Sequence, residues 1–267
     1  MPLSRSETKN LRALQTRKGR RTSRRFLAEG VRLLEEALRF KRYPVRLYFA
    51  PSVLSPRGAQ VVERFRKAGA PTHQVSAAEL SRIADTETSQ GLLAVFDLPN
   101  QRLSELIQPS MRTVLLCENL SDPGNVGTLI RSALAFDFDL VVLVGRCAET
   151  FSPKVVRASV GAVFGMPVAS AELTETLAAA ERGRFRIVAA ALQGSDSMKT
   201  VLNTMKNSQI MLAIGSEADG LSPQMIQAAH KLVRIEHSRQ VESLNSAMAG
   251  AILMKECYDS RSRRKSS

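Results

Sequence analysis

Residues 119–135 read NLSDPGNVGTLIRSALA and follow an apolar run at 113–117 that we interpret as a β-strand. After an Asp-Pro-Gly turn, apolar side chains recur from Asn125 onward at the spacing of an amphipathic helix. Two later stretches, 213–223 (AIGSEADGLSP) and 232–248 (LVRIEHSRQVESLNSAM), repeat the order of strand, polar or glycine-rich loop, and helix start. Because ligands of open parallel sheets bind beyond the carboxyl ends of the strands, we expect these three loops to form one site.

The pattern around these loops predicts an α/β protein with two domains. In the second half of the chain strands alternate with helices, which is typical of a parallel sheet covered by helices on both faces. The strands are expected at 113–117, 140–144, 186–191, 209–214 and 232–236, and the helices at 125–136, 153–159, 172–182, 222–230 and 243–258. A smaller α/β domain precedes this region and is expected to begin with a helix over 23–40.

The boundaries follow from changes in composition along the chain. A linker is expected at 98–112, where two prolines interrupt any regular period. The predicted organisation in chain order is a basic flexible arm at 1–21, the small α/β domain at 22–97, the linker, the larger α/β domain at 113–258 and a basic tail at 259–267.

The net charge of +13 is concentrated at the two ends of the chain. Residues 1–42 hold 13 Lys and Arg against 4 Asp and Glu, residues 259–267 hold 4 against 1, and residues 43–258 keep only +1. A one-sided excess of cations favours a nucleic-acid partner, because phosphates release counterions when they meet Lys and Arg. The alternative is a solvated arm that keeps the protein soluble.

The composition also indicates the cellular compartment in which the protein is expected. There is no run of about 18 apolar residues that would span a membrane, and the basic start lacks the apolar segment of a secretory signal. The three cysteines, at positions 117, 147 and 257, are far apart and form no CxxC pair, so we expect neither a disulfide nor a thiolate metal site. We expect a cytoplasmic protein; an Arg-rich start also suits an organellar matrix.

Each of the three loops has an ordinary structural interpretation beside a functional one. Asn125 could cap its helix and leave Arg131 in solvent. The glycines of 215–220 could form a simple turn with Glu217 exposed, and Ser243 could be only the N-cap of the last helix. Small residues in that helix suit close packing against a helix of the same chain or of a second subunit; they are Ala247, Ala249, Gly250 and Ala251.

Other chemistries find little support in the sequence. The three histidines are isolated and none belongs to an HExxH motif, so we expect no metal. No serine lies in GxSxG, and no GxGxxG follows a strand, which disfavours a hydrolase and a nucleotide-dependent oxidoreductase. Gly220 is followed by Leu rather than by Lys-Ser/Thr, which argues against a P-loop.

Taken together, the three loops resemble the motifs of the SpoU/TrmH branch of the SPOUT RNA methyltransferases. The first is similar to motif 1 through Asn125, Gly127, Ile130 and Arg131, the second to motif 2 through Gly215, Glu217, Gly220 and Leu221, and the third to motif 3 through Ile235, Glu242, Ser243, Leu244 and Asn245. Their order and spacing match over 113–257. Residues 22–97 resemble the RNA substrate-binding domain often found ahead of this region, through the stretches AEGVRLLEEAL and IADTETSQGLLAVF.

The resemblance implies 2′-O-methylation of a ribose in RNA, most simply in 23S-type ribosomal RNA, by analogy with the two-domain plan. It also implies a deep trefoil knot in the catalytic domain and a homodimer with the last helix in the interface. The cofactor implied is S-adenosylmethionine, bound near Leu192, Gly194, Gly215, Ile235 and Leu244. The polar site residues that carry over are Asn125, Arg131, Glu217, Ser243 and Asn245.

Some points stay open at the level of sequence. The family mechanism makes Arg131 the base; because guanidinium groups keep their proton in proteins, the alternative is that it fixes a phosphate and stabilises developing alkoxide charge. Ser246-Ala247 stands where the family usually has Val-Ser, and Asp137 where it usually has Gly; we expect Ser246 to point elsewhere on its helix. Alternative functions are a tRNA 2′-O-methyltransferase, an antibiotic-resistance rRNA methyltransferase and, in another class, a non-catalytic RNA-binding protein.

Overall fold

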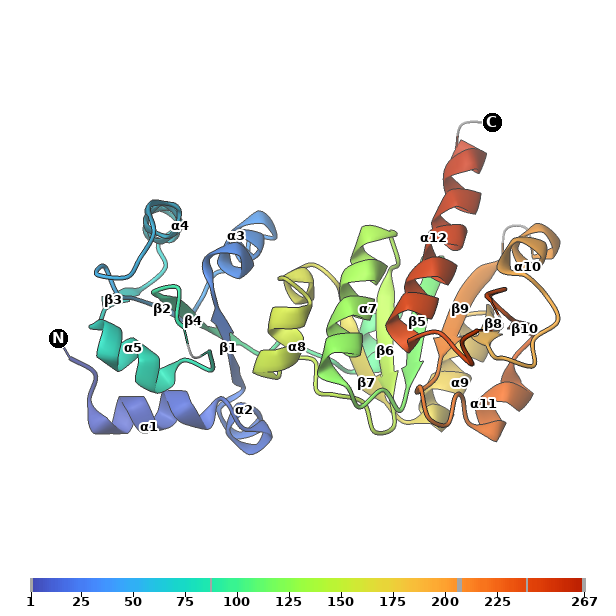
Figure 1. The fold of residues 1–267 in the computed structure, drawn as a ribbon, viewed down its shortest axis with the longest axis horizontal. Coiled ribbons are helices and arrows are strands. Elements are labelled where there is room, and N and C mark those ends of the chain that lie inside the picture. The colour runs from blue at the N-terminus through green and yellow to red at the C-terminus, as the bar shows by residue number, and fades with distance from the viewer. Residues whose placement is uncertain (1, 87, 206–207, 239, 266–267) are drawn as a thin grey trace. The chain divides into compact units, whose positions relative to one another are not determined.

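The chain forms two compact units, which we name unit 1 and unit 2 (Figure 1). The computed structural model describes residues 2–86, 88–205, 208–238 and 240–265. Unit 1 consists of Met1–Pro99 together with Glu149–Gly165, which we name the return segment, and unit 2 consists of Asn100–Ala148 together with Met166–Ser267. The expected order of a small and a larger α/β region is present, but the chain goes back to unit 1 before it completes unit 2.

Unit 1 is built on a four-stranded mixed sheet in the order β1-β4-β2-β3. Strand β4 pairs antiparallel with both β1 and β2, and β2 pairs parallel with β3. The elements of this unit are α1 (Arg5–Ala13), α2 (Arg17–Ser23), β1 (Arg25–Glu29), α3 (Val31–Arg39), β2 (Arg46–Phe49), α4 (Pro56–Lys67), β3 (Thr72–Gln74), α5 (Ala77–Ile83), β4 (Leu92–Asp97), α8 (Pro153–Ala158) and the 3-10 helix η1 (Ala162–Phe164). Ser76 and Glu79 form a capping box at the start of α5.

The first 21 residues differ from the flexible arm that we predicted. They form α1 and most of α2, and the hydroxyl of Ser4 accepts the amide hydrogen of Glu7 at the start of α1. Leu11 and Leu14 are only 6% and 4% exposed and join a core made with side chains of β2, β4 and α5. This apolar anchoring holds the basic segment on unit 1, so its cations are displayed at fixed places on a surface.

The helix predicted over 23–40 is wrong in its first part. The chain forms strand β1 there, and α3 begins only at Val31. Phe26 and its two successors are all buried, because β1 pairs with β4 and is also covered by α8. Gly30, with φ of 108°, separates the strand from the helix in a backbone conformation that residues with a side chain rarely adopt.

The return segment completes unit 1 through an ion pair and an aromatic cluster. Arg20 is 3% exposed and donates from Nη2 to Oε2 of Glu149 at 2.6 Å, and it donates from Nη1 to two backbone carbonyl oxygens. The rings of Phe151 and Phe164 lie 4.6 and 6.0 Å from the ring of Phe26. A segment that the sequence assigned to the larger domain therefore contributes to the core of the smaller one.

Unit 2 contains a six-stranded, wholly parallel sheet in the order β10-β8-β9-β5-β6-β7. Its elements are α6 (Leu103–Leu106), β5 (Thr113–Glu118), α7 (Pro123–Ala135), β6 (Leu140–Val144), β7 (Val168–Ala171), α9 (Leu173–Arg182), β8 (Phe185–Ala190), α10 (Met198–Thr204), β9 (Gln209–Ile214), α11 (Pro223–Ala228), β10 (Lys231–Val233) and α12 (Ser246–Lys265). The predicted parallel sheet is confirmed, with β7, α10 and α6 as additions; α6 lies within the predicted linker 98–112. The trefoil knot stays a prediction.

The long last helix, α12, packs on α7 (Figure 1). A Cβ atom on Gly250 would lie 2.4 Å from Cδ2 of Leu129 on α7, so any side chain at this position of α12 would have to displace Leu129. Ala247 is also buried. The small residues of the last helix thus allow a close contact with a helix of the same chain. Among the described residues, none of the helices is long and apolar enough to cross a membrane.

The predicted basic tail continues α12 as far as Lys265, and residues 266–267 lie outside the described part of the chain. Within this extension the guanidinium of Arg261 donates to the carbonyl oxygens of Phe136 and Asp137, where α7 ends. Cations are favourable at helix C-termini, where carbonyl groups lack helical partners. The last turns of α12 are therefore tied to the end of α7.

Candidate active site

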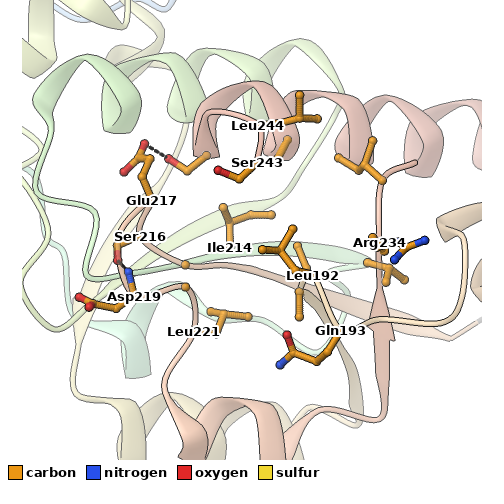
Figure 2. A pocket seen from close by; sticks show the side chains of 18 of the residues that line it. Leu192, Gln193, Ile214, Ser216, Glu217, Asp219, Leu221, Arg234, Ser243 and Leu244 are labelled. Carbon is orange, nitrogen blue, oxygen red and sulfur yellow. Dashed lines mark hydrogen bonds between the residues drawn. The ribbon is translucent and has the colours of Figure 1, made fainter. Parts of the chain in front are cut away.

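A cavity of about 420 Å³ opens at the carboxyl-terminal ends of β8, β9 and β10 (Figure 2). The loop after β9 borders it with Gly215–Leu221, and the loop after β10 borders it with residues from Arg234 to Leu244. The loop after β8, with Leu192 and Gln193, forms a further wall. The second and third of the loops identified in the sequence therefore do meet. The first does not line this cavity and joins the others through side-chain hydrogen bonds.

Those hydrogen bonds connect four residues of the three stretches into a polar cluster. The Nδ2 atom of Asn125, on α7, donates to Oε1 of Glu217 in the loop after β9. The Nδ2 atom of Asn245, just before α12, donates to Oδ1 of Asn125 at 3.1 Å. The hydroxyl of Ser246 donates to the same Oε1 of Glu217 (Figure 2). Three segments that are far apart in the sequence thus converge on one carboxylate.

Asn125 can reach Glu217 because it does not cap its own helix. Helix α7 begins two residues earlier than predicted, with Pro123 as its first residue and Asp122 as its N-cap. The carboxylate of Asp122 accepts the amide hydrogen of Asn125 at 2.8 Å. The backbone of Asn125 is therefore satisfied by Asp122, and its side-chain amide remains available to the other two loops.

The start of α12 also differs from the prediction. Asn245, not Ser243, caps this helix: its Oδ1 accepts the amide hydrogens of Ala247 and Met248 at 3.0 and 3.2 Å. Ser246 is consequently the first residue of α12 and is 6% exposed. Our expectation that Ser246 points elsewhere was wrong. The sequence carries no signal for this contact, because Glu217 lies on another loop, 29 residues earlier, that only the folded sheet brings close.

The remaining predicted polar residues are not part of the cluster. Ser243 lines the cavity but is exposed. Arg131 lies on the exposed side of α7 and does not line the cavity. Among the residues that the structure describes, Arg131 makes no hydrogen bond or ion pair. The guanidinium is therefore presented to solvent.

The cavity combines apolar side chains with exposed backbone and carboxylates. Of the residues predicted to hold a cofactor, Leu192, Gly215, Ile235 and Leu244 line it, whereas Gly194 does not. A Cβ atom on Gly194 would lie 2.7 Å from the carbonyl carbon of Val233, so this glycine lets the loop after β8 approach the end of β10. Gly194 therefore affects the cavity only through the placement of this loop.

Hydrogen bonds from the end of β5 hold neighbouring segments in place. The carboxylate of Glu118, 3% exposed at the end of β5, accepts the amide hydrogen of Ser222 at 2.8 Å and so ties the start of α11 to β5. Oδ1 of Asn119 accepts the amide hydrogen of Arg146 at 2.9 Å. Burial raises the pKa of the Cys147 thiol, which keeps this nearby sulfur protonated and makes it a poor nucleophile.

Comparison with known proteins shows which family the chain belongs to. Residues 112–255, more than half of the chain, match the SpoU rRNA Methylase family. The chain belongs to this family. Residues 5–94 match the MRM3-like substrate binding domain, a region that covers α1 to β4 of unit 1. The resemblance seen in the three motifs and in the small domain is therefore confirmed.

The individual relatives match the chain over most of its length. It is 28% identical over 248 residues to the 23S rRNA (guanosine(2553)-2′-O)-methyltransferase RlmP of Bacillus subtilis, covering 93% of the chain and 94% of that relative. An AdoMet-bound rRNA methyltransferase from Sinorhizobium meliloti superposes with a TM-score of 0.83 at 29% identity, covering 96% of each chain. A putative TrmH-family RNA methyltransferase from Porphyromonas gingivalis gives 0.79 at 31%, covering 95% and 97%. This chain, as a member of the SpoU family, is thus an RNA methyltransferase.

Proposed function

We propose that this chain methylates a ribose 2′-hydroxyl in ribosomal RNA with S-adenosylmethionine as the methyl donor. The observation that carries the proposal is the polar cluster of Asn125, Glu217, Asn245 and Ser246, which lies beside the cavity and is built from the three family motifs. The 2′-O specificity is also the reaction named for the relative from Bacillus subtilis. The tRNA and antibiotic-resistance alternatives share the chemistry and differ only in the RNA.

The cavity fits S-adenosylmethionine. Its volume of about 420 Å³ lies in the range of small-molecule sites. Apolar Leu192, Ile214 and Leu221 suit the flat adenine, and Glu217, Asp219 and Glu242 on the lining suit a cationic ligand. The cofactor is S-adenosylmethionine; when bound it supplies an electrophilic methyl group on a sulfonium.

The residues of this chain orient the acceptor ribose hydroxyl and stabilise the negative charge that develops on its oxygen. The reaction is an in-line attack by a ribose oxygen, so the acceptor must be held about 3 Å from the methyl group. Glu217, fixed by Asn125 and Ser246, presents a carboxylate of set direction at the rim, where a ribose hydroxyl can donate to it. Arg131, presented to solvent, is assigned to a phosphate of the RNA and to the negative charge that develops on the attacking oxygen.

The decisive experiment maps methylated riboses. Total RNA from cells that lack the gene, containing both rRNA and tRNA, is incubated with purified protein and S-adenosylmethionine, and then hydrolysed in alkali. A 2′-O-methyl group prevents the 2′ oxygen from attacking the adjacent phosphodiester, so one newly resistant linkage is expected. A methyl group on a base, or methylation confined to tRNA, would contradict the proposal; failure to bind the cofactor in calorimetry would exclude an enzyme.

Loss of the Ser246 hydroxyl should impair catalysis without unfolding the protein. Ser246→Ala leaves Glu217 with one partner fewer, and hydrogen bonds to charged groups contribute enough to predict about a tenfold fall in kcat. Thr174→Ala, an exposed hydroxyl on α9, is the matched control and should keep full activity. Steady-state methylation assays check both; an unchanged kcat for Ser246→Ala would show that the Glu217 contact is dispensable.

We also propose a homodimer through unit 2, which the family resemblance implies. Met248 and Ile252 on α12 are large apolar side chains that are 58% and 39% exposed. One helical turn separates them, so they form an apolar strip that a second copy would cover. Light scattering should give twice the chain mass of 29.3 kDa, and Ile252→Glu should shift that mass toward the monomer. A monomeric wild-type protein would refute this arrangement.

A further inference from the structure

Unit 1 has a cavity of its own, of about 340 Å³, between α1 and one end of the sheet. Val95 on β4 pairs with Leu27 on β1 and with Arg46 on β2, so these three side chains share one face of the sheet. Arg25, two residues before Leu27, lies on that same face. Helix α1 packs on this face through Leu11 and Leu14, and the cavity is lined by residues of α1 and of the strands.

The floor of the cavity is apolar and its rim is polar. Leu11, Leu14, Tyr48 and Val95 are at most 6% exposed and form the buried surface. The rim consists of side chains that can donate or accept hydrogen bonds: Glu7, Asn10, Ser23, Arg25 and Arg46.

The cations of the rim are matched by carboxylates. Arg46 Nη1 lies 3.1 Å from Glu7 Oε1, and Arg25 Nε lies 3.3 Å from Asp97 Oδ1. Because each arginine is paired with a carboxylate, the net charge of the rim is near zero. The rim still offers hydrogen-bond donors and acceptors. A simple anion would have to break a pair, whereas a flat, neutral, heteroaromatic group could lie on the apolar floor and exchange hydrogen bonds with the rim.

We propose that this cavity receives a single unpaired nucleobase of the RNA substrate. Its volume exceeds what one base needs, and proteins recognise RNA most often through splayed-out bases that rest on apolar or aromatic side chains. The proposal rests on the proposed function, because it takes RNA as the substrate. It adds a base-binding site in unit 1, distinct from the polar cluster of unit 2.

Cations on the two helices that contribute to the cavity support an RNA occupant over a peptide or a free metabolite. Lys9 and Arg12 on α1, and Arg21 and Arg24 at the end of α2, are exposed. In the described part of the chain none of these four forms an ion pair with a carboxylate. Unpaired exposed cations on these helices suit a nucleotide chain, whose phosphates remain outside while one base enters.

The test compares RNA with and without bases, using the full-length protein. Single-stranded oligonucleotides of roughly eight nucleotides, and abasic RNA of the same length, are titrated by fluorescence anisotropy at fixed salt. The wild-type protein should bind base-containing RNA about tenfold more tightly than abasic RNA. Ser23→Phe fills the cavity from α2 and should abolish that ratio, while Thr22→Phe, an exposed neighbour that does not line the cavity, should keep it.

Several outcomes would overturn the proposal. They are an unchanged ratio in Ser23→Phe, a ratio near one in the wild type, and displacement of the RNA by a free nucleotide at micromolar concentration. Should Ser23→Phe fail to fold, Asn10→Phe fills the cavity from the exposed side of α1 and must abolish the ratio instead. Methylation of ribosomal RNA by the wild type is measured in parallel. If the base-binding proposal fails, this assay still tests the proposed function separately.

Discussion

Arg131→Ala should reduce kcat for RNA methylation by about 10²–10³-fold, the loss expected when a charge-stabilising donor is removed from an active site. The affinity for S-adenosylmethionine should not change, because Arg131 does not line the cofactor cavity. The fold should also be unaffected, since this guanidinium is exposed and has no partner among the described residues. Single-turnover methylation and calorimetry measure the two quantities separately. Arg182→Ala, an exposed arginine on α9, is the matched control.

Arg131→Lys separates the two roles that are open for this side chain. If the residue removes the proton from the ribose hydroxyl, a lysine should introduce a new, lower apparent pKa in the pH–rate profile, because lysine loses its proton more readily than arginine. If the residue only fixes a phosphate and stabilises charge, the profile should keep its shape while kcat falls. We expect the second result. Full activity in Arg131→Ala would remove Arg131 from the mechanism altogether.

Arg20→Ala should lower the free energy of unfolding of unit 1 by about 3–5 kcal/mol, the usual cost of removing one partner from a buried ion pair. Arg20 is 3% exposed and makes two hydrogen bonds to Glu149 and one each to the carbonyl oxygens of Leu14 and Gln15. The variant leaves a partly buried carboxylate and two carbonyl groups without this donor. Urea unfolding, followed by a probe in unit 1, measures the change.

Arg17→Ala is the matched control for that experiment. Arg17 also lies within 4.0 Å of Glu149, but its side chain is 66% exposed, so the loss should stay below about 1 kcal/mol. Equal losses in the two variants would show that burial of Arg20 does not determine its contribution. The methylation rate at low temperature should survive in both, because neither residue belongs to the polar cluster of unit 2.

The loops of unit 2 could be predicted because each carries its own local signals. An apolar strand, a turn with Pro or Gly and a capping residue are all visible in the sequence, and Ser222 with Pro223 starts α11 as expected. What the sequence missed were the helix cap and a contact between loops. Asn245 rather than Ser243 caps α12, and Ser246 donates to Glu217. Glu217 lies 29 residues earlier, so this contact depends on how the sheet places the two loops.

Unit 1 shows a second kind of failure. Phe26 and Leu27 fit a helical period with the residues that follow, and only pairing with the distant strand β4 makes them part of a strand. Leu11 and Leu14 belong to a short, highly charged segment, and their burial depends on a sheet formed by later residues. Charge alone indicated a flexible arm because it does not report on a few well-placed apolar side chains.

The return segment has a consequence for the order in which the protein can mature on the ribosome. Domains usually fold as units while synthesis proceeds at about 5–20 residues per second. The first 99 residues of unit 1 are made early, but part of the aromatic cluster and the carboxylate partner of Arg20 come only with Glu149–Gly165. Until then Phe26 lacks its contacts with Phe151 and Phe164, and the guanidinium of Arg20 lacks Glu149. The N-terminal unit therefore matures only after two strands of the catalytic sheet, β5 and β6, have been synthesised.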